Sequence, residues 1–167
     1  MHNEETYMTK EELVATAAAL PHPTPAAAHE YSEKRERLAA EINRIMGQRT
    51  DLEDLIGAGN HDMMEDNHRN HARFLTSLFQ DFSPVVLVET VLWVFRAYRS
   101  HGFHLTYWPA QLDTWVEIFK KELTPAAFES IYPVYRWMII HQPAFADLSD
   151  RFVLPEVTPG HQEEDRA

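Results

Sequence analysis

Histidine and glutamate side chains recur at helical spacing in the segment HDMMEDNH, residues 61–68. His61, Glu65 and His68 are separated by four and three residues, so a helix would place all three on one face. Imidazole and carboxylate groups bind metals, and Glu65 with His68 forms the Glu-x-x-His unit that di-iron helical bundles use twice. The second copy is missing from this chain. A metal site and a solvated, acidic helix start are the two interpretations, and we favour the solvated start.

Further histidines raise the question of a haem site. His71 follows in the same segment, and His101 and His104 fall near the end of the next apolar segment. A single buried histidine can ligate haem iron in a helical protein. A lone histidine is more often a packed or hydrogen-bonded residue. We therefore predict no cofactor, and a haem- or metal-binding protein is the alternative interpretation.

An aromatic stretch and one charged pair indicate where a small molecule would bind. Residues 101–109 read HGFHLTYWP, and aromatics with polar tips can line a pocket or seal the end of a helical bundle. Glu89 and Arg96 lie seven residues apart in the apolar segment just upstream. They are interpreted either as a structural ion pair or as polar groups that bind a ligand. The predicted ligand-binding residues are His71, Trp93, Arg96, His104, Tyr107 and Trp108.

The chain lacks the common catalytic patterns. Its serines occur without a nucleophile-elbow motif, and its five glycines form no phosphate-binding loop. Cysteine is absent, so the chain has neither a thiol nucleophile nor a disulfide. We predict that the protein is not an enzyme.

Charge and hydropathy narrow the classes of partner. The formal net charge of −11 is repelled by phosphate backbones, so nucleic acid is not predicted as a partner. The apolar stretch at residues 13–20 is too short to span a membrane. The N-terminus is acidic where a secretory signal would be basic. These observations predict an acidic, cytoplasmic protein that does not bind a membrane.

Helix-start signals divide the chain into successive helices. Capping boxes are predicted at Thr9 with Glu12 and at Thr50 with Glu53, and a threonine or serine precedes proline at residues 24, 83 and 124. The segment 84–98 is apolar nearly all round, which predicts the central, most buried helix, with Trp93 in the core. Pro133 is expected to kink or split the last helix. No strand-like alternation of any length occurs.

These elements predict an all-α protein with five to seven helices. The first choice is a globin-like helical domain, and the alternative is a four-helix bundle with an N-terminal helical arm. The predicted organisation is a helical arm at 1–23, a helical core domain at 24–147 and an acidic flexible tail at 148–167.

A pattern in the second half of the chain is similar to a known family. It comprises Asn70-His71 followed by Phe74-Leu75, a helix with Trp93 at its middle, a break at 101–103, then Leu112 and residues 119–123. This order resembles the helical region found just upstream of the cobalamin-binding domain in bacterial light- and cofactor-sensing regulators. The resemblance covers about residues 67–144, roughly half of the chain.

The resemblance implies a sensor module with a globin-like or phycobilisome-like helical arrangement. Cobalamin proteins of this kind carry Asp-x-His-x-x-Gly in a following α/β domain, and this motif is absent here. Cobalamin is therefore not implied for this chain. The predicted function is a non-enzymatic, cytoplasmic sensory or regulatory module that acts through a protein partner or a homodimer. Binding of a small apolar ligand is an optional part of this prediction.

Overall fold

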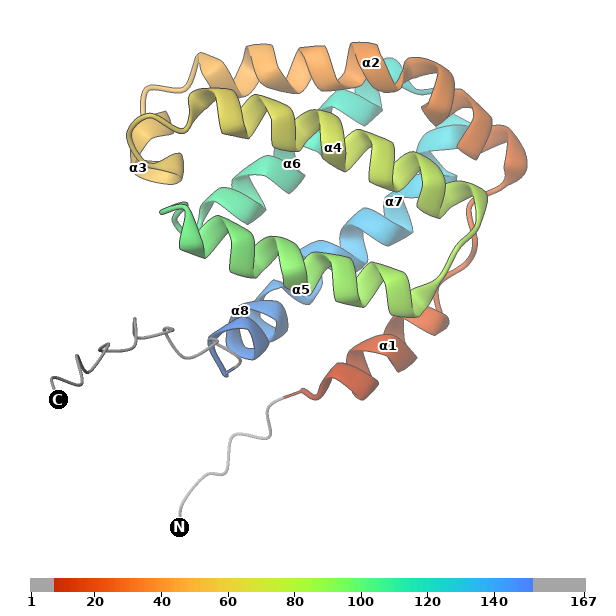
Figure 1. Cartoon of the computed structure of the whole chain (residues 1–167). Helices are drawn as coiled ribbons and strands as arrows, with labels where there is room; N and C mark the ends of the chain where they lie inside the picture. The colour runs from red at the N-terminus through yellow and green to blue at the C-terminus, as the bar shows by residue number, and fades with distance from the viewer. Residues whose placement is uncertain (1–7, 152–167) are drawn as a thin grey trace, which may run out of the picture.

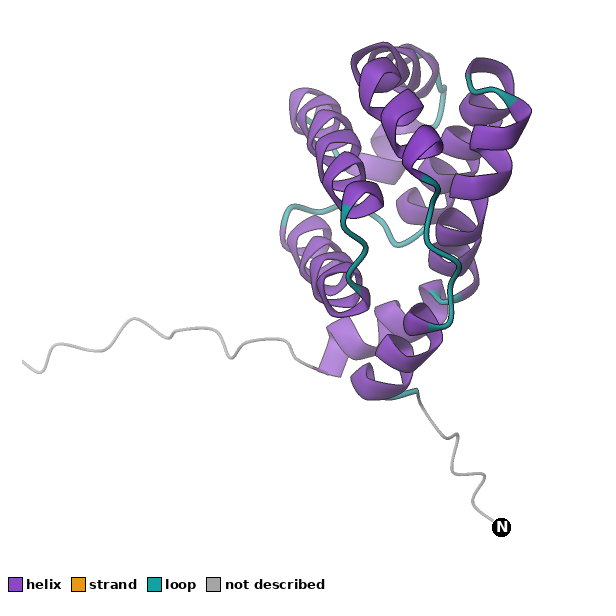
Figure 2. Cartoon of the chain, turned by 90° about the vertical axis from the view of Figure 1, so that its right-hand side faces the viewer, coloured by secondary structure: helices purple, strands orange, loops and turns teal. Residues whose placement is uncertain are grey.

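Helices make up most of the described part of the protein. The computed structural model describes residues 8–151, in which eight helices and no strand occur (Figures 1 and 2). Their bounds are α1 (Lys10–Ala18), α2 (Pro25–Gly47), α3 (Leu52–Ile56), α4 (His61–Gln80), α5 (Pro84–Ser100), α6 (Tyr107–Glu122), α7 (Pro125–Ile140) and α8 (Gln142–Arg151). The prediction of an all-α fold is confirmed. None of these helices combines the length and hydropathy needed to cross a lipid bilayer.

Side-chain caps start four of the helices where the sequence predicts them. Thr24, Ser83 and Thr124 each accept a hydrogen bond from the backbone N–H three residues on, at 3.1, 3.3 and 3.4 Å. A proline follows each cap, where its missing N–H removes no helical hydrogen bond. Thr9 and Glu12 form the predicted capping box at the start of α1. These starts depend only on neighbouring residues, which is why the sequence reveals them.

One capping prediction is wrong. Thr50 and Glu53 do not form a capping box, because α3 starts one residue later, after Asp51, without a side-chain cap. At Pro133, where the sequence predicts a kink or a split, α7 does not split but continues to Ile140. The chain turns only at His141, where α8 begins.

The helices form two layers around an aromatic core. In Figure 1, α4 and α5 lie in front and α6 and α7 cross behind them, while α2 packs along α4 and also contacts α6 and α7. Figure 2 shows the two layers from the side. Among the largest fully buried side chains are Tyr31, Trp115, Phe119 and Tyr135, which pack against one another. Their rings pack edge to face or offset, with Phe119 and Tyr135 centroids 4.8 Å apart.

Helix α5 is not the buried centre that its composition predicts. Trp93 is 67% exposed, and Val85 and Val86 are 47% and 46% exposed. The opposite face of α5, which includes Leu87 and Val91, is buried. Because α5 lies at the edge of the front layer, only part of its apolar surface is covered by other helices. Placing Trp93 in the core was therefore wrong, and α6 carries the most deeply buried tryptophan, Trp115.

Helix α1 packs on the core beside α5. Leu13 and Ala17 are fully buried, and Trp137 of α7 donates a hydrogen bond from Nε1 to Thr16 Oγ1 at 2.9 Å. At the other end, α8 extends to Arg151 and buries Leu148, so the predicted boundary at 147 falls inside a helix. Residues 152–167 of the predicted tail lie outside the described residues.

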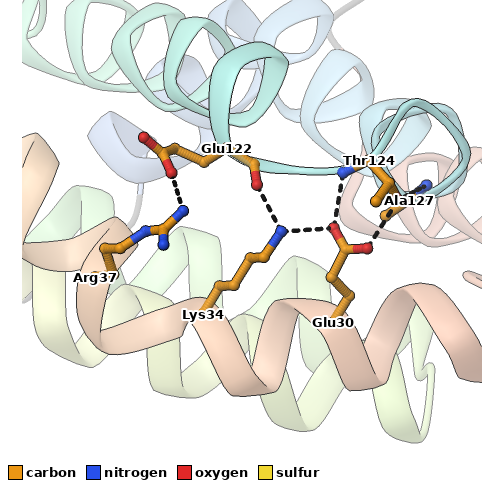
Figure 3. A network of polar contacts seen from close by, with 6 residues as sticks. All are labelled: Glu30, Lys34, Arg37, Glu122, Thr124 and Ala127. Atoms are coloured by element: carbon orange, nitrogen blue, oxygen red, sulfur yellow. Dashed lines mark hydrogen bonds and ion pairs between the residues drawn. The ribbon is translucent and has the colours of Figure 1, made fainter.

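A polar network fastens α2 to the junction between α6 and α7 (Figure 3). The Glu30 carboxylate accepts hydrogen bonds from the backbone N–H and the hydroxyl of Thr124, both at 2.8 Å. Lys34 donates to the Glu122 carbonyl oxygen at 2.7 Å, and Arg37 pairs with the Glu122 carboxylate. Burial alone would raise the pKa of Glu30, but the bonds from Thr124 and the charge of Lys34 outweigh it and lower that pKa. The anionic Glu30 thus lies at the positive end of the α7 dipole.

Candidate ligand-binding pocket

A pocket of about 380 Å³ separates α4 from α5. These two helices make few close backbone contacts, which leaves room between their side chains. Trp108 of α6 and Met138 of α7 close the back of the pocket. Its aliphatic wall consists of Met63, Leu75, Val91, Val94, Ala97 and Met138. A volume of this size lies within the range of small-molecule sites, which are mainly apolar with a few placed polar groups.

The pocket is lined by no carboxylate, ammonium or guanidinium group. Although 25% of the chain is Asp, Glu, Lys or Arg, none of the fifteen lining residues is. Asn67, Asn70, Thr90 and His101 line the pocket, and their side chains hydrogen-bond to no other side chain or backbone group within residues 8–151. The side chains of Asn67, Asn70 and Thr90 therefore offer free neutral donors and acceptors beside an apolar wall.

His71 forms the inner wall between the pocket and the core. Its Nε2 lies 2.8 Å from the Tyr135 hydroxyl, and its ring stacks on Trp115 with centroids 5.1 Å apart and an angle of 12°. Part of the residue remains exposed to the pocket, although the imidazole is surrounded by protein. Burial lowers the pKa of His71 from 6.5 to about 3. The ring is therefore neutral at physiological pH.

His68 lies one turn away and is fully buried. Its Nδ1 donates to Asn43 Oδ1 at 2.6 Å, because an amide oxygen can only accept. Its Nε2 then accepts from the Tyr107 hydroxyl at 2.7 Å. Burial first, and then the charges of Arg69 and of His71 when it is protonated, lower the pKa of His68 to about 3. Both ring nitrogens are occupied, so His68 has no free lone pair for a metal.

Hydrogen bonds extend from the pocket wall across the core. Tyr135, which bonds His71, also lies 3.4 Å from the hydroxyl of Tyr31 on α2. Burial raises the pKa of both tyrosines, so both stay protonated. A residue of the α4–α5 pocket is thus connected to α7 and to α2 through three side chains.

Buried polar groups also remain unpaired behind the pocket. Gln111 of α6 is 0% exposed, yet neither atom of its amide forms a regular hydrogen bond within residues 8–151. It lies near the Tyr98 hydroxyl, where it partly offsets the rise that burial causes in the pKa of Tyr98. The indole nitrogen of Trp108 is also buried without a partner in the described chain. Each such group costs about 1–3 kcal/mol.

The six predicted ligand-binding residues divide into two groups. His71, Trp93 and Trp108 line the pocket. Arg96 lies instead in a separate hollow between α1, α5 and α8. The His104 ring is exposed and bonds its neighbour Thr106. Tyr107 is fully buried and bonds His68. The structure thus brings three of the six residues together and disperses the others.

The predicted metal-binding trio is likewise divided. His61 Nδ1 and Glu65 Oε1 lie 3.3 Å apart at the surface, as a solvated helix start requires. His68 does not belong to that surface, so the favoured interpretation was wrong for this residue. His68 is buried because the side of α4 that carries it packs on α2, whereas His61 on the first turn of α4 remains exposed. Among residues 8–151, no three histidine, aspartate or glutamate side chains are placed to hold a metal ion together.

Sequence reasoning missed the polar partners of the two histidines. Asn43, Tyr31 and Tyr135 come from helices far along the chain, and no local pattern marks them. Asn67 and Asn70 could have been found, because with Phe74 they recur at three and four residues on one face of a helix.

Comparisons with known protein families, with curated proteins and with solved structures find no match for this chain. The chemistry of the pocket therefore carries the functional argument. A histidine with a pKa near 3 is a weak base at neutral pH, and a general base works best with a pKa near the working pH. The arrangement favours binding of an uncharged molecule over proton transfer.

Proposed function

We propose that this protein is a non-enzymatic, cytoplasmic sensory or regulatory module that binds a small, mainly apolar ligand between α4 and α5. The observation that carries the proposal is the uncharged pocket of about 380 Å³, walled by aliphatic and aromatic side chains. Apolar surface removed from water supplies the affinity, at about 25 cal/mol per Å². The free neutral groups at Asn67 and Asn70 orient the ligand.

A sensor must pass on whether its pocket is occupied. His71 touches the pocket and is hydrogen-bonded through Tyr135 to Tyr31, so a ligand that shifts His71 also acts on α7 and α2. Helix α5 offers a second route, because Trp93 lines the pocket and is 67% exposed to solvent. An exposed aromatic beside Val85 and Val86 suits contact with a protein partner or a second copy of the chain.

A neutral, polarity-sensitive dye tests this proposal directly. N-phenyl-1-naphthylamine brightens when it enters an apolar site, and we expect saturable binding of one dye per chain. Ala97 lines the pocket, so Ala97→Phe should fill it and weaken dye binding at least tenfold. Val85→Phe adds a ring of the same size to the same helix outside the pocket, and it should leave dye binding unchanged.

The result that overturns the proposal is equally plain. If the folded protein binds no dye at 100 µM, or if Ala97→Phe and Val85→Phe bind it equally, the pocket is not a ligand site. Circular dichroism of all three proteins verifies that each is folded.

We also propose a globin-like arrangement of the helices. A globin-like arrangement and the likeness to helical regions upstream of cobalamin-binding domains agree with a sensor role but are not required by the pocket. The haem- or metal-binding alternative has less support. His68 has both ring nitrogens occupied, and His71 Nε2 is bonded to Tyr135.

A further inference from the structure

The lining of the α4–α5 pocket narrows the chemistry of its ligand. On the basis of the function proposed above, we propose that the ligand is an uncharged, planar heteroaromatic molecule of two or three rings. We further propose that its edge carries neutral hydrogen-bonding groups, which bind Asn67 and Asn70. Three independent features of the pocket support this assignment.

The first feature is the absence of acidic and strongly basic side chains from the lining. No Asp, Glu, Lys or Arg is among the fifteen lining residues, and burial keeps His71 neutral. A charged ligand would lose its hydration without gaining an ion pair, which is strongly unfavourable. An anion would also be repelled by the net charge of −11.

The second feature is the aromatic wall together with the volume. Phe74, Trp93, Tyr98 and Trp108 line the pocket with the rings of His71 and His101. Flat rings stack well on such surfaces. An apolar cavity of about 150 Å³ holds benzene, so a pocket of about 380 Å³ has room for two or three fused rings.

The third feature is the pair of amides on α4. Asn67 and Asn70 lie three residues apart on the pocket face of α4, and neither side chain bonds another residue in the range 8–151. Each amide presents a donor and an acceptor, which matches the lactam or amidine edge of a heterocycle. A plain hydrocarbon would leave these groups without such a partner.

Four two-ring probes of similar size separate these features. Each probe competes with N-phenyl-1-naphthylamine for binding to the full chain. Two probes are neutral: 2-quinolone has a lactam edge, and naphthalene is wholly apolar. The other two are charged: 2-naphthoate is an anion and N-methylquinolinium is a cation. We expect 2-quinolone to bind about tenfold more tightly than naphthalene, since two neutral hydrogen bonds are worth about that factor. Both charged probes should bind at least tenfold more weakly than 2-quinolone.

Substitutions test whether the amides of Asn67 and Asn70 cause the tighter binding of 2-quinolone. The double substitution Asn67→Leu and Asn70→Leu should reduce 2-quinolone binding to the level of naphthalene and leave naphthalene binding unchanged. Ser77→Leu, at an exposed position on α4 outside the pocket, is the control and should change neither. If naphthalene binds as tightly as 2-quinolone, or a charged probe binds most tightly, the assignment is refuted while the pocket remains a binding site. If the dye itself fails to bind, the proposed function fails instead.

Discussion

Two buried histidines on α4 predict that acid destabilises the protein well above the range in which carboxylates titrate. Burial lowers the pKa of both His68 and His71 from 6.5 to about 3 in the folded state. Between these two values the unfolded chain binds a proton at each ring and the folded chain does not. Acidification through this window therefore favours unfolding, whereas above pH 6.5 both states are neutral and the effect vanishes.

The loss of free energy of unfolding can be calculated from the pKa shifts of the two histidines. Each pH unit below 6.5 costs about 1.4 kcal/mol per histidine, so at pH 5 each ring accounts for about 2 kcal/mol. Together the pair removes up to about 4 kcal/mol. His71 contributes less of this free-energy loss than His68, because part of His71 is exposed to the pocket. Domains of this kind are stable by only about 5–15 kcal/mol, so the loss is large.

Urea unfolding followed by helical circular dichroism measures this loss at pH 7.5, 6 and 5. The free energy of unfolding should fall by several kcal/mol across the series. The double substitution His68→Gln and His71→Gln should lower stability at pH 7.5, since hydrogen bonds are disturbed, but it should largely abolish the dependence on pH. His29→Gln, whose side chain is 74% exposed, is the control and should keep the parent slope.

Equal free energies of unfolding at pH 7.5 and pH 5 would refute the reasoning. An unchanged slope in the double variant would do so as well, because the protons would then be taken up elsewhere.

Three further substitutions test the packing and the α2–α7 network. Trp115→Ala should lower the free energy of unfolding by about 3–5 kcal/mol, since Trp115 is fully buried against His71 and Phe119; a loss under 1 kcal/mol in urea unfolding would contradict its central place. Trp93→Ala should change stability by less than about 0.5 kcal/mol, and a large drop in melting temperature would show that Trp93 is packed after all. Glu30→Gln should cost about 1 kcal/mol, measured by the same unfolding assay, because the charge at the start of α7 is lost; no change would mean that the bonds from Thr124 contribute nothing.

Helix starts were predictable from sequence because they are local. The hydroxyls of Thr9, Thr24, Ser83 and Thr124 bond backbone groups only three residues away. After the last three of these caps a proline is preorganised for the first helical position. The all-α class follows from such signals and from the absence of strand-like alternation. How the helices contact one another leaves no comparable local mark.

Burial was predicted less well, because it depends on which neighbours cover a helix. The segment that became α5 is apolar on nearly every side, yet only one side is covered and Trp93 faces solvent. The reverse holds for His68, which looks like part of a polar surface but is fully buried. In each case a distant helix decides the outcome: α5 lies at the edge of its layer, and α2 supplies Asn43 to the buried imidazole.

The pocket was predictable in part. Histidine and tryptophan are unusual enough that His71, Trp93 and Trp108 attract attention in any sequence, and all three line the pocket. Aliphatic lining such as Val94 and Met138 cannot be told from ordinary core residues by type. Its role follows only from the gap that α4 and α5 leave between them.

Helix α4 shows how one segment can serve the core and the pocket together. His68 faces α2, and its two ring nitrogens are hydrogen-bonded to Asn43 and Tyr107. Asn67 and Asn70, by contrast, line the pocket, and their side-chain amides are free to bind a ligand. His71 lies between these two faces and joins them, since it lines the pocket and bonds Tyr135 in the core. A ligand held by the two amides would therefore contact the imidazole of His71, which is neutral because it is buried. If occupancy excludes water from His71, the folded-state pKa of that ring falls further. Saturating ligand should then raise the free energy of unfolding at pH 7.5 and at pH 5 alike, and the loss between these two pH values should not become smaller.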